Sequence, residues 1–373
     1  MKKIKIVHFI TGLGVGGAEK MLLKSLPRMN KRFGNIVVSP SHGDTGDKLK
    51  ANGIDVRYLL KKGETFKLSR LGYSIKEFKK IIGKEKPDML VTYLIHADLF
   101  GRVFGRLYGV KKIVCFERGS LVNWNFLRFF DRMSSVLVTH YLSVSEALAY
   151  YLKKYWLFSK NKITVIQNGI VLKDFNIKVE QAKKLKELGL TNRDFVITFT
   201  ANLRQGKGHD YLLKAISIAK NKAKNIKLLL IGADQGEESK IKTIIDQLGI
   251  SKYVKILGFR SDVFEILKTS NLFVFPSLHE GMSNALLEAM TAGCPIIASD
   301  ILENRELIKN KKSGLLSPVK DPKSWARAIL NIYNNKSQRL LYGANARKTI
   351  EDQFAIERTV KRFEEALKKI YKN

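Results

Sequence analysis

Short hydrophobic runs rich in β-branched residues alternate with longer segments of helical periodicity along the whole chain. In the first half, strands are predicted at 4–10, 35–40, 88–94, 111–116, 136–145 and 162–168. Five further runs follow at 195–201, 226–233, 253–259, 271–277 and 294–300. Apolar strands separated by helical segments are typical of parallel sheets, because each parallel connection crosses over one face of the sheet. The pattern therefore predicts an α/β protein with two doubly wound parallel sheets.

The two series of strands predict two domains. A chain of 373 residues is long for one α/β core and sufficient for two. The break is expected near 170–190, where Asn168-Gly169 ends a strand and a polar segment follows. We expect a first domain over residues 1–175 and a second over 176–354. Residues 355–373 form a basic amphipathic pattern, interpreted as a helix that returns to the first domain.

Composition excludes several classes of protein. Hydrophobic residues make up 45% and charged residues 27%, as in a folded globular protein. No run approaches 18 apolar residues, and the chain starts directly with a strand instead of a signal peptide. Cys115 and Cys294 lie in apolar runs and are predicted to be reduced, buried thiols. We therefore expect a cytoplasmic protein that is neither secreted nor membrane-spanning.

The net charge is +33, from 67 Lys and Arg against 34 Asp and Glu. Residues 1–170 hold 31 basic and 12 acidic residues, a net charge of +19. A basic surface in water and adhesion to an anionic membrane or nucleic acid both remain open. Four lysines fall at helical spacing opposite an apolar stripe, which predicts a packed helix with cations facing outward: Lys76, Lys79, Lys80 and Lys84.

A glycine-rich loop follows the first strand. Gly12, Gly14 and Gly17 match the spacing G-x-G-x-x-G. A nicotinamide-binding enzyme needs an acidic residue after the second strand, but that strand ends Val38-Ser39-Pro40, which disfavours an oxidoreductase. Two interpretations remain: a tight turn, or backbone amides that approach a phosphate at a helix N-terminus.

The second half contains a denser group of candidate residues. Arg204 and Lys207 follow the strand at 195–201, and two cations on a glycine-containing loop suit a diphosphate. Glu280 precedes a predicted helix and Glu288 lies within it. The two carboxylates are too far apart on a helix to act on one atom, but each can contact a different part of an elongated ligand. A solvated acid pair is the alternative.

Taken together, these motifs resemble the retaining glycosyltransferases of family 4, in the glycogen-synthase-like group with the GT-B fold. The resemblance spans nearly the whole chain. Its segments are GGAE at 16–19, VIQNGI at 165–170, NLRQGKG at 202–208, VKILGFRSDV at 254–263 and HEGMSNALLEAMTAGCPIIASD at 279–300. The resemblance implies two Rossmann-like domains that face each other across a cleft, with the acceptor bound by the first domain and the nucleotide sugar by the second.

The resemblance also implies roles for individual residues. Arg204 and Lys207 are expected to neutralise the diphosphate, Glu288 to bind the ribose and Glu280 to contact the donor sugar. The remaining expected nucleotide-sugar contacts are Gly16, Gly17, Phe259, Arg260, Gly281, Met282, Ser283 and Asn284. No cofactor or metal ion is expected, because the family is metal-independent and the chain has no Asp-x-Asp motif and no His/Cys cluster with ligand spacing.

One departure from the family pattern affects the first domain. Many relatives carry a histidine where this chain reads Glu117-Arg118. Glu117 is a candidate polar contact or base, with a structural ion pair as the alternative. His96 is a second catalytic candidate, and His140 is expected to be a hydrogen-bonded histidine in the core.

The sequence is thus interpreted as a retaining transferase of a hexose or N-acetylhexosamine from a nucleotide-diphosphate sugar. UDP is favoured over GDP as the nucleotide. The expected acceptor is a lipid-linked glycan, lipopolysaccharide or polysaccharide precursor at the inner face of the membrane, where the protein binds peripherally. The alternatives are an epimerase or phosphorylase on the same fold, and a basic nucleic-acid-binding protein. No motif for the last of these is found, so no nucleic-acid partner is expected.

Overall fold

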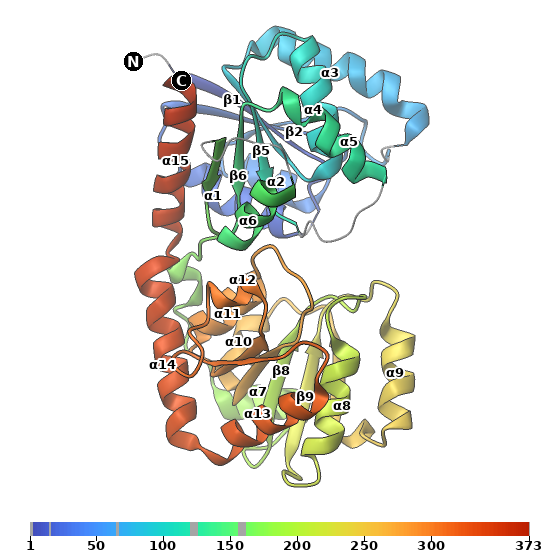
Figure 1. Ribbon diagram of the computed structural model, residues 1–373, viewed down its shortest axis with the longest axis vertical. Helices are drawn as coiled ribbons and strands as arrows, with labels where there is room; N and C mark the ends of the chain where they lie inside the picture. The colour runs from blue at the N-terminus through green and yellow to red at the C-terminus, as the bar shows by residue number, and fades with distance from the viewer. Residues whose placement is uncertain (1–2, 15, 65–66, 120–125, 156–161, 373) are drawn as a thin grey trace. The chain divides into compact units, whose positions relative to one another are not determined.

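The chain folds into two compact α/β units in a computed structural model (Figure 1). The structure describes residues 3–372 except 15, 65–66, 120–125 and 156–161. The N-terminal unit comprises residues 1–169 and 356–373, and the C-terminal unit residues 170–355. The boundaries expected at 175 and 354 lie within a few residues of this division.

The N-terminal unit is built on a seven-stranded sheet with the order β3-β2-β1-β4-β5-β6-β7. All of its pairings are parallel. Its strands are β1 (Ile4–Ile10), β2 (Phe33–Ser39), β3 (Asp55–Tyr58), β4 (Met89–Tyr93), β5 (Ile113–Glu117), β6 (His140–Ser143) and β7 (Ile163–Val165). Its helices are α1 (Gly17–Ser25), α2 (Asp44–Ala51), α3 (Leu71–Glu85), α4 (Ile95–Leu107), α5 (Phe126–Ser134), α6 (Glu146–Tyr155) and α15 (Ile356–Lys372).

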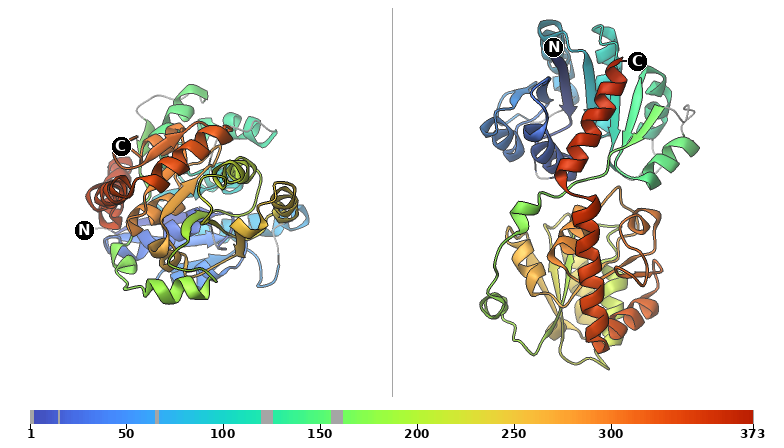
Figure 2. Two further views of the ribbon diagram at one scale, coloured as in Figure 1. Left: turned by 90° about the horizontal axis from the view of Figure 1, so that it is seen from below. Right: turned by 90° about the vertical axis from the view of Figure 1, so that its left-hand side faces the viewer.

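Alternation of side chains along β1 places different helices on the two faces of this sheet. Phe9 packs on Phe78 of α3 and Phe100 of α4, at ring-centroid distances of 5.1 and 5.3 Å. His8 points to the other face, where its ring lies 6.3 Å from Phe363 of α15. The last helix therefore packs on the first sheet, as the right-hand view in Figure 2 shows in red.

The C-terminal unit is built on a six-stranded parallel sheet with the order β10-β9-β8-β11-β12-β13. Its strands are β8 (Phe195–Thr200), β9 (Ile226–Ile231), β10 (Val254–Gly258), β11 (Leu272–Phe275), β12 (Ile296–Ser299) and β13 (Leu315–Ser317). Its helices are α7 (Gln181–Glu187), α8 (His209–Ala219), α9 (Glu238–Gln247), α10 (Val263–Thr269), α11 (Asn284–Ala292), α12 (Leu302–Arg305), α13 (Pro322–Asn334) and α14 (Lys336–Gln353).

The predicted fold class is confirmed, and two strands were missed. β3 has the sequence DVRY, in which only Val56 is buried, so its pattern is that of a solvated sheet edge. β13 has only three residues, too few to show a period. The strand predicted at 136–145 is shorter than expected, because a 3-10 turn, η3 (Ser135–Leu137), precedes β6 and leaves Val136 82% exposed.

Each sheet reverses its winding at its centre. In the N-terminal unit the chain moves from β1 outward to β3, then crosses back to β4 and continues the other way. The C-terminal unit repeats this pattern with β8 and β11 as the central pair. At such a switch point the loops after neighbouring strands diverge, and open α/β sheets bind ligands in the resulting crevice. No helix in the described part of the chain is long and apolar enough to span a bilayer.

Candidate functional site

Two loops meet at the switch point of the C-terminal sheet. One follows β8 and holds NLRQGKG, and the other follows β11 and leads into α11. The backbone N–H of Leu278 donates to the carbonyl of Gly206 over 2.9 Å and joins the two loops. Gly208 has a φ of 77°, and a Cβ atom there would collide with the carbonyl of Pro276. Only glycine permits this close approach, so Gly208 is required for the packing of the two loops.

Lys207 and Glu280 form an ion pair across these loops. Lys207 Nζ donates to Glu280 Oε1 over 2.6 Å, and the two side chains are only 12% and 13% exposed. Arg204 lies on the same loop, and its side chain is exposed. A cation and a carboxylate that are held together with a second cation nearby can bind a ligand carrying both phosphate and hydroxyl groups.

The N-terminus of α11 faces the same edge of the sheet. Ser283 is the N-cap residue, and its hydroxyl accepts a hydrogen bond from the backbone N–H of Leu286 over 3.2 Å. Gly281, Met282 and Ser283 are buried, which holds their backbone in place ahead of the helix. The partial positive charge at this helix end favours an anionic ligand.

The two remaining predicted residues of this loop and helix are half-buried. Asn284 is the first residue of α11. Glu288 lies in the second turn of α11, so it is displaced along the helix from the Lys207–Glu280 pair. Glu280 and Glu288 are thus separated along the chain by the first turn of α11, so they lie too far apart to act on one atom.

The loop after β10, predicted to contact the base, has an exposed aromatic ring and an arginine that is paired with carboxylates. Phe259 is 67% exposed. Arg260 bonds to Asp262 and Glu187, with 2.6 Å between its Nη2 and the nearest oxygen of each. Hydrogen bonds from the Arg260 guanidinium hold the pKa of Asp262 well below its usual range. Arg260 is therefore already occupied by carboxylates, which the sequence pattern did not indicate.

Two residues beside this site were missed by sequence reasoning. Burial lowers the pKa of His209, at the start of α8, to about 4, so its imidazole is neutral at pH 7. Glu303 of α12 is 7% exposed, and its pKa is raised by burial and, to a smaller extent, by the charges of Glu280 and Glu306. His209 directly follows a predicted motif, whereas nothing in the local pattern around Glu303 distinguishes it from a surface acid.

Two cavities differ in their position relative to this edge. A cavity of about 230 Å³ opens beside the β8 loop and is lined by Arg204, Gly206 and His209. A larger one, of about 500 Å³, lies at the amino end of β1 and β2, away from the switch point of its own sheet. The smaller cavity is the one that belongs to the candidate site.

In the N-terminal unit the predicted glycines lie at the first switch point. Gly16 is the extended N-cap residue of α1, which begins at Gly17. A Cβ atom on Gly16 would collide with the carboxylate of Glu19, which folds back over the start of the helix. Burial raises the pKa of Glu19, and the charge of Arg118 partly opposes this shift.

Arg118 itself was not predicted as a site residue. Its guanidinium lies 4.9 Å from the centre of the Phe116 ring and donates to Asn168 Oδ1 through Nη2. Its Nε and Nη1 are buried and have no hydrogen-bond partner among the residues that the structure describes. Burial lowers the pKa of Arg118 to about 10. Arg118, at the position where this chain departs from the family pattern, thus interacts with residues of the segments GGAE and VIQNGI within the N-terminal unit.

Glu117 belongs to a buried ionic cluster. It is 4% exposed, and its Oε1 lies 3.7 Å from Arg102 Nη2. Arg102 is fully buried and also pairs with Asp131 over 2.6 Å. These surroundings favour the structural ion pair that the sequence left as an alternative. His96, in contrast, is exposed in the first turn of α4.

His140 and the cysteines are as expected, apart from the extent of burial of His140. His140 is only half-buried, and its Nε2 bonds to Thr164 Oγ1 over 2.8 Å. Cys115 and Cys294 are free, buried thiols. No group of three His, Cys, Asp or Glu side chains within the described ranges is placed to hold a metal ion.

Each of the two units is built on a doubly wound parallel sheet, and in the C-terminal unit the loops after β8 and β11 meet at the switch point, where such sheets bind ligands. Sequence comparison assigns each unit. The family described as glycosyl transferases group 1 matches residues 180–349, and glycosyltransferase family 4 matches residues 15–174. The chain thus belongs to the family 4 glycosyltransferases and has the GT-B fold.

Relatives and solved structures agree with this assignment. The UDP-Gal:alpha-D-GlcNAc-diphosphoundecaprenol alpha-1,3-galactosyltransferase of Escherichia coli is 27% identical, over 96% of this chain and 95% of its own. The capsular polysaccharide biosynthesis glycosyltransferase CapM of Staphylococcus aureus is 25% identical, over 95% and 94%. The crystal structure of Anabaena Alr3699/HepE in complex with UDP superposes with a TM-score of 0.85 at 20% identity, over 98% of this chain and all of that one.

Proposed function

We propose that this glycosyltransferase moves a hexose or N-acetylhexosamine from a nucleotide-diphosphate sugar to a lipid-linked glycan or polysaccharide precursor. The observation that supports this most directly is the Lys207–Glu280 pair, 2.6 Å apart beside Arg204 and the N-terminus of α11. Cations suited to a diphosphate and a carboxylate suited to sugar hydroxyls lie side by side there. The sugar–diphosphate junction is where such a transferase acts.

The chemical role of the cations follows from the charge that develops in the reaction. As the bond from the sugar carbon to the diphosphate oxygen breaks, negative charge grows on the leaving diphosphate. Arg204 and Lys207 stabilise that charge, and the α11 backbone amides add to the same field. The acceptor hydroxyl attacks on the same face that the diphosphate leaves, and its proton passes to the departing diphosphate oxygen, so the sugar configuration is retained. No metal ion takes part in this proposal.

Each remaining residue has a proposed contact. Glu280 accepts hydrogen bonds from the donor sugar, and Glu288, further along α11, accepts them from the ribose. The exposed ring of Phe259 offers a surface for the base, because aromatic rings stack on bases of any sequence. Gly16 and Gly17, at the start of α1, are the proposed nucleotide-sugar contacts of the N-terminal unit. Arg260, held by Glu187 and Asp262, positions this base-contacting loop without binding the base directly.

UDP is the proposed nucleotide. The names of the Escherichia coli relative and of the HepE complexes mention UDP-galactose, UDP and UDP-glucose. The acceptor class is supported by the same relative, whose name specifies a sugar on diphosphoundecaprenol, and by CapM, whose name specifies capsular polysaccharide. Such acceptors lie at a membrane, which makes peripheral binding at the inner, cytoplasmic face part of the proposal.

The basic helix α3 supports the membrane part of the proposal. Lys76, Lys79, Lys80 and Lys84 are exposed, while Phe78 and Ile82 are buried. The helix thus presents cations to solvent and keeps its apolar stripe in the core. Each lysine close to anionic lipid contributes roughly 1 kcal/mol, an attraction that salt screens.

The activity is tested with a panel of radiolabelled UDP- and GDP-sugars, with and without membrane extract. Label is expected to enter the lipid fraction from a UDP-sugar and only when extract is present. The variant with both Arg204→Ala and Lys207→Ala serves as the inactive control. Transfer that is equally rapid in this variant contradicts the proposed site, and transfer from GDP-sugars alone contradicts the proposed nucleotide.

A further inference from the structure

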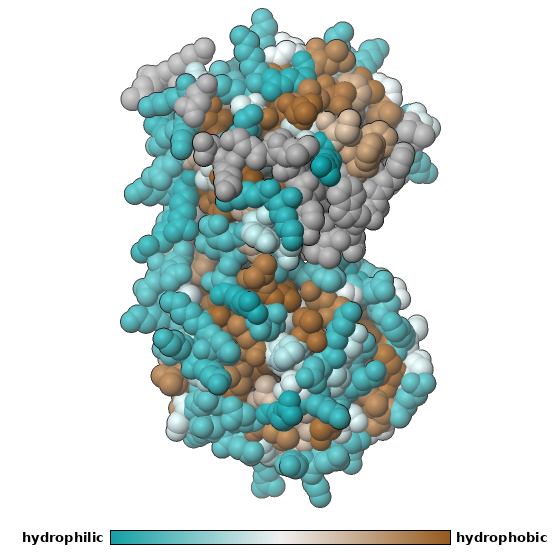
Figure 3. Space-filling view, viewed as in Figure 1, coloured by the Kyte–Doolittle hydropathy of each residue, from teal (hydrophilic) through white to brown (hydrophobic). Residues whose placement is uncertain are grey.

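Exposed hydrophobic side chains of the N-terminal unit gather on two neighbouring helices. Of its eight large hydrophobic residues described as exposed, six lie on α4, α5 and the turn η3. Their exposed fractions range from 45% to 82%. We call these six residues the α4–α5 apolar surface: Val103, Leu107, Phe129, Phe130, Met133 and Val136. Figure 3 shows hydrophobic side chains in brown over this region.

Three charged residues of these helices are buried: Asp98, Arg102 and Asp131. Arg102 of α4 is fully buried, and its Nη1 contacts Asp131 of α5 at 2.6 Å. Asp98 of α4 is fully buried and accepts a hydrogen bond from Thr92. The pairing of α4 with α5 thus uses an internal ion pair and leaves apolar side chains outside. This is the reverse of the usual arrangement in a solvated helix pair.

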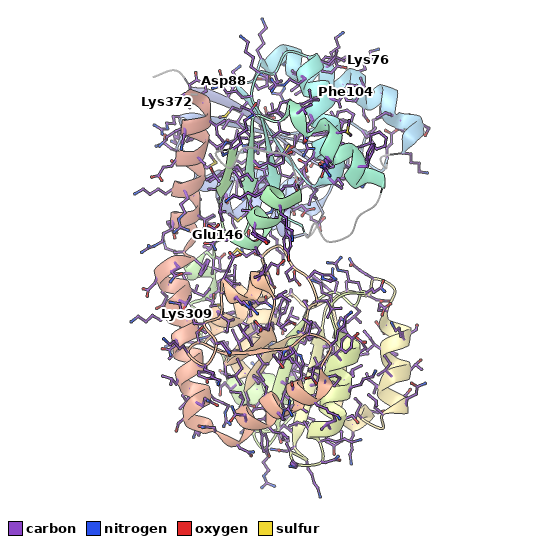
Figure 4. All side chains as sticks on the ribbon, viewed as in Figure 1. Lys76, Asp88, Phe104, Glu146, Lys309 and Lys372 are labelled. Atoms are coloured by element: carbon purple, nitrogen blue, oxygen red, sulfur yellow. The ribbon has the colours of Figure 1, made fainter. Side chains whose placement is uncertain are left out.

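No carboxylate is exposed along this part of the chain. Residues 95–137 contain three acidic residues, Asp98, Glu117 and Asp131, and all three are buried. The basic helix α3 lies beside α4: Lys79 Nζ is 5.9 Å from the ring centre of Tyr108, and α3 and α4 also meet through Phe78 and Phe100. Figure 4 labels Lys76 on α3 and Phe104 on α4 within this region. The α4–α5 apolar surface is therefore flanked by the lysines of α3, and α4, α5 and η3 themselves expose no carboxylate.

We propose that the α4–α5 apolar surface inserts into the interfacial region of an anionic lipid bilayer, with the α3 lysines contacting the headgroups. An exposed apolar face flanked by cations suits the boundary between acyl chains and anionic headgroups. A second copy of this chain is a poor occupant, because two surfaces of like positive charge repel each other. The proposal deepens the proposed function, since it places the N-terminal unit at the surface where a lipid-linked acceptor resides.

Two kinds of variant separate insertion from attraction. Phe129→Ser with Met133→Ser removes two apolar side chains one helical turn apart, and is expected to weaken binding to vesicles of phosphatidylglycerol and phosphatidylcholine about 10- to 100-fold at every salt concentration. Lys76→Gln with Lys84→Gln is expected to reduce the dependence of binding on salt. Leu340→Ser with Leu341→Ser is the matched control, because those residues of α14 are 67% and 57% exposed outside this surface.

Insertion itself is measured with an environment-sensitive fluorophore on Met133→Cys. Labelling is selective, because Cys115 and Cys294 are buried and burial raises the pKa of both thiols. Vesicles are expected to shift the emission to the blue and increase it, while the same label on Leu340→Cys stays unchanged. Unshifted emission at position 133 in bound protein overturns insertion.

Two further outcomes also overturn the proposal. In one, the Phe129 and Met133 variant binds vesicles as the wild type does. In the other, sedimentation shows that Phe129 and Met133 are needed for a dimer of the protein, while the affinity of the protein for vesicles is the same with and without these two residues. The proposed function fails separately if the protein inserts into vesicles but transfers no sugar to a water-soluble acceptor analogue.

Discussion

Removing Lys207 is the most direct test of the diphosphate site. One cation about 4 Å from the growing charge, at an effective dielectric constant of about 20, contributes about 4 kcal/mol. Loss of a single preorganised donor to a developing oxyanion costs roughly 100- to 1000-fold in rate. We therefore expect Lys207→Ala to lower kcat/KM by that factor. The exposed Lys214 of α8 is the matched control, and Lys214→Ala is expected to leave the rate unchanged.

The ion pair adds a second, distinguishing expectation. Glu280 Oε1 lies 2.6 Å from Lys207 Nζ and is largely enclosed, so Lys207→Ala leaves a carboxylate beside the incoming diphosphate. Glu280→Gln removes that repulsion. The fold-loss of kcat/KM in the variant with both Lys207→Ala and Glu280→Gln is expected to be about tenfold smaller than the product of the fold-losses of the two single variants. This difference corresponds to a coupling free energy of about 1.4 kcal/mol. Initial rates at saturating acceptor concentration are measured for the wild type, the two single variants and the double variant, which together form a double-mutant cycle. Losses that multiply would refute the coupling, and unchanged turnover in Arg204→Ala with Lys207→Ala would refute the site.

Three other predictions follow from the same geometry. Glu288→Ala is expected to weaken binding of UDP alone in calorimetry, whereas Glu280→Ala spares it and slows sugar transfer; equal losses of UDP affinity would show the two roles to be wrong. Glu117→Gln is expected to lower the melting temperature and leave the pH profile of kcat unchanged, because Glu117 lies against buried Arg102; a shifted profile would instead support a catalytic base. Burial lowers the pKa of His8 to about 4, so the folded state excludes a proton that the unfolded state takes up near pH 6.5. The contribution of His8 to stability is therefore complete above pH 6.5 and falls by about 3 kcal/mol as the pH drops toward 4, and in thermal melts His8→Gln should make the loss of stability with falling pH less steep; an unchanged slope would assign the effect to other groups.

The apolar and polar pattern was sufficient for the fold class and for the edge of the sheet that carries the site. Parallel strands expose their carboxyl ends on one edge, so Arg204, Glu280 and the glycine loop were predictable from the strands that they follow. The buried cysteines were predictable for the same reason, because a residue within an apolar strand or turn has little access to water. β3 and β13 were missed because one is half-solvated and the other is too short to show a period.

Pairings between residues distant in sequence were decided only by the tertiary structure. Lys207 meets Glu280 across 73 positions because β8 and β11 are neighbours in the sheet order. Arg260 is held by Glu187, and Glu117 and Asp131 lie against Arg102, for the same kind of reason. Local periodicity assigns a residue to a face, but it contains no information about which charge is on the facing element. Between α4 and α5 an ion pair places Arg102 and Asp131 inside, while exposed apolar residues of the same helices form the surface proposed to meet the membrane.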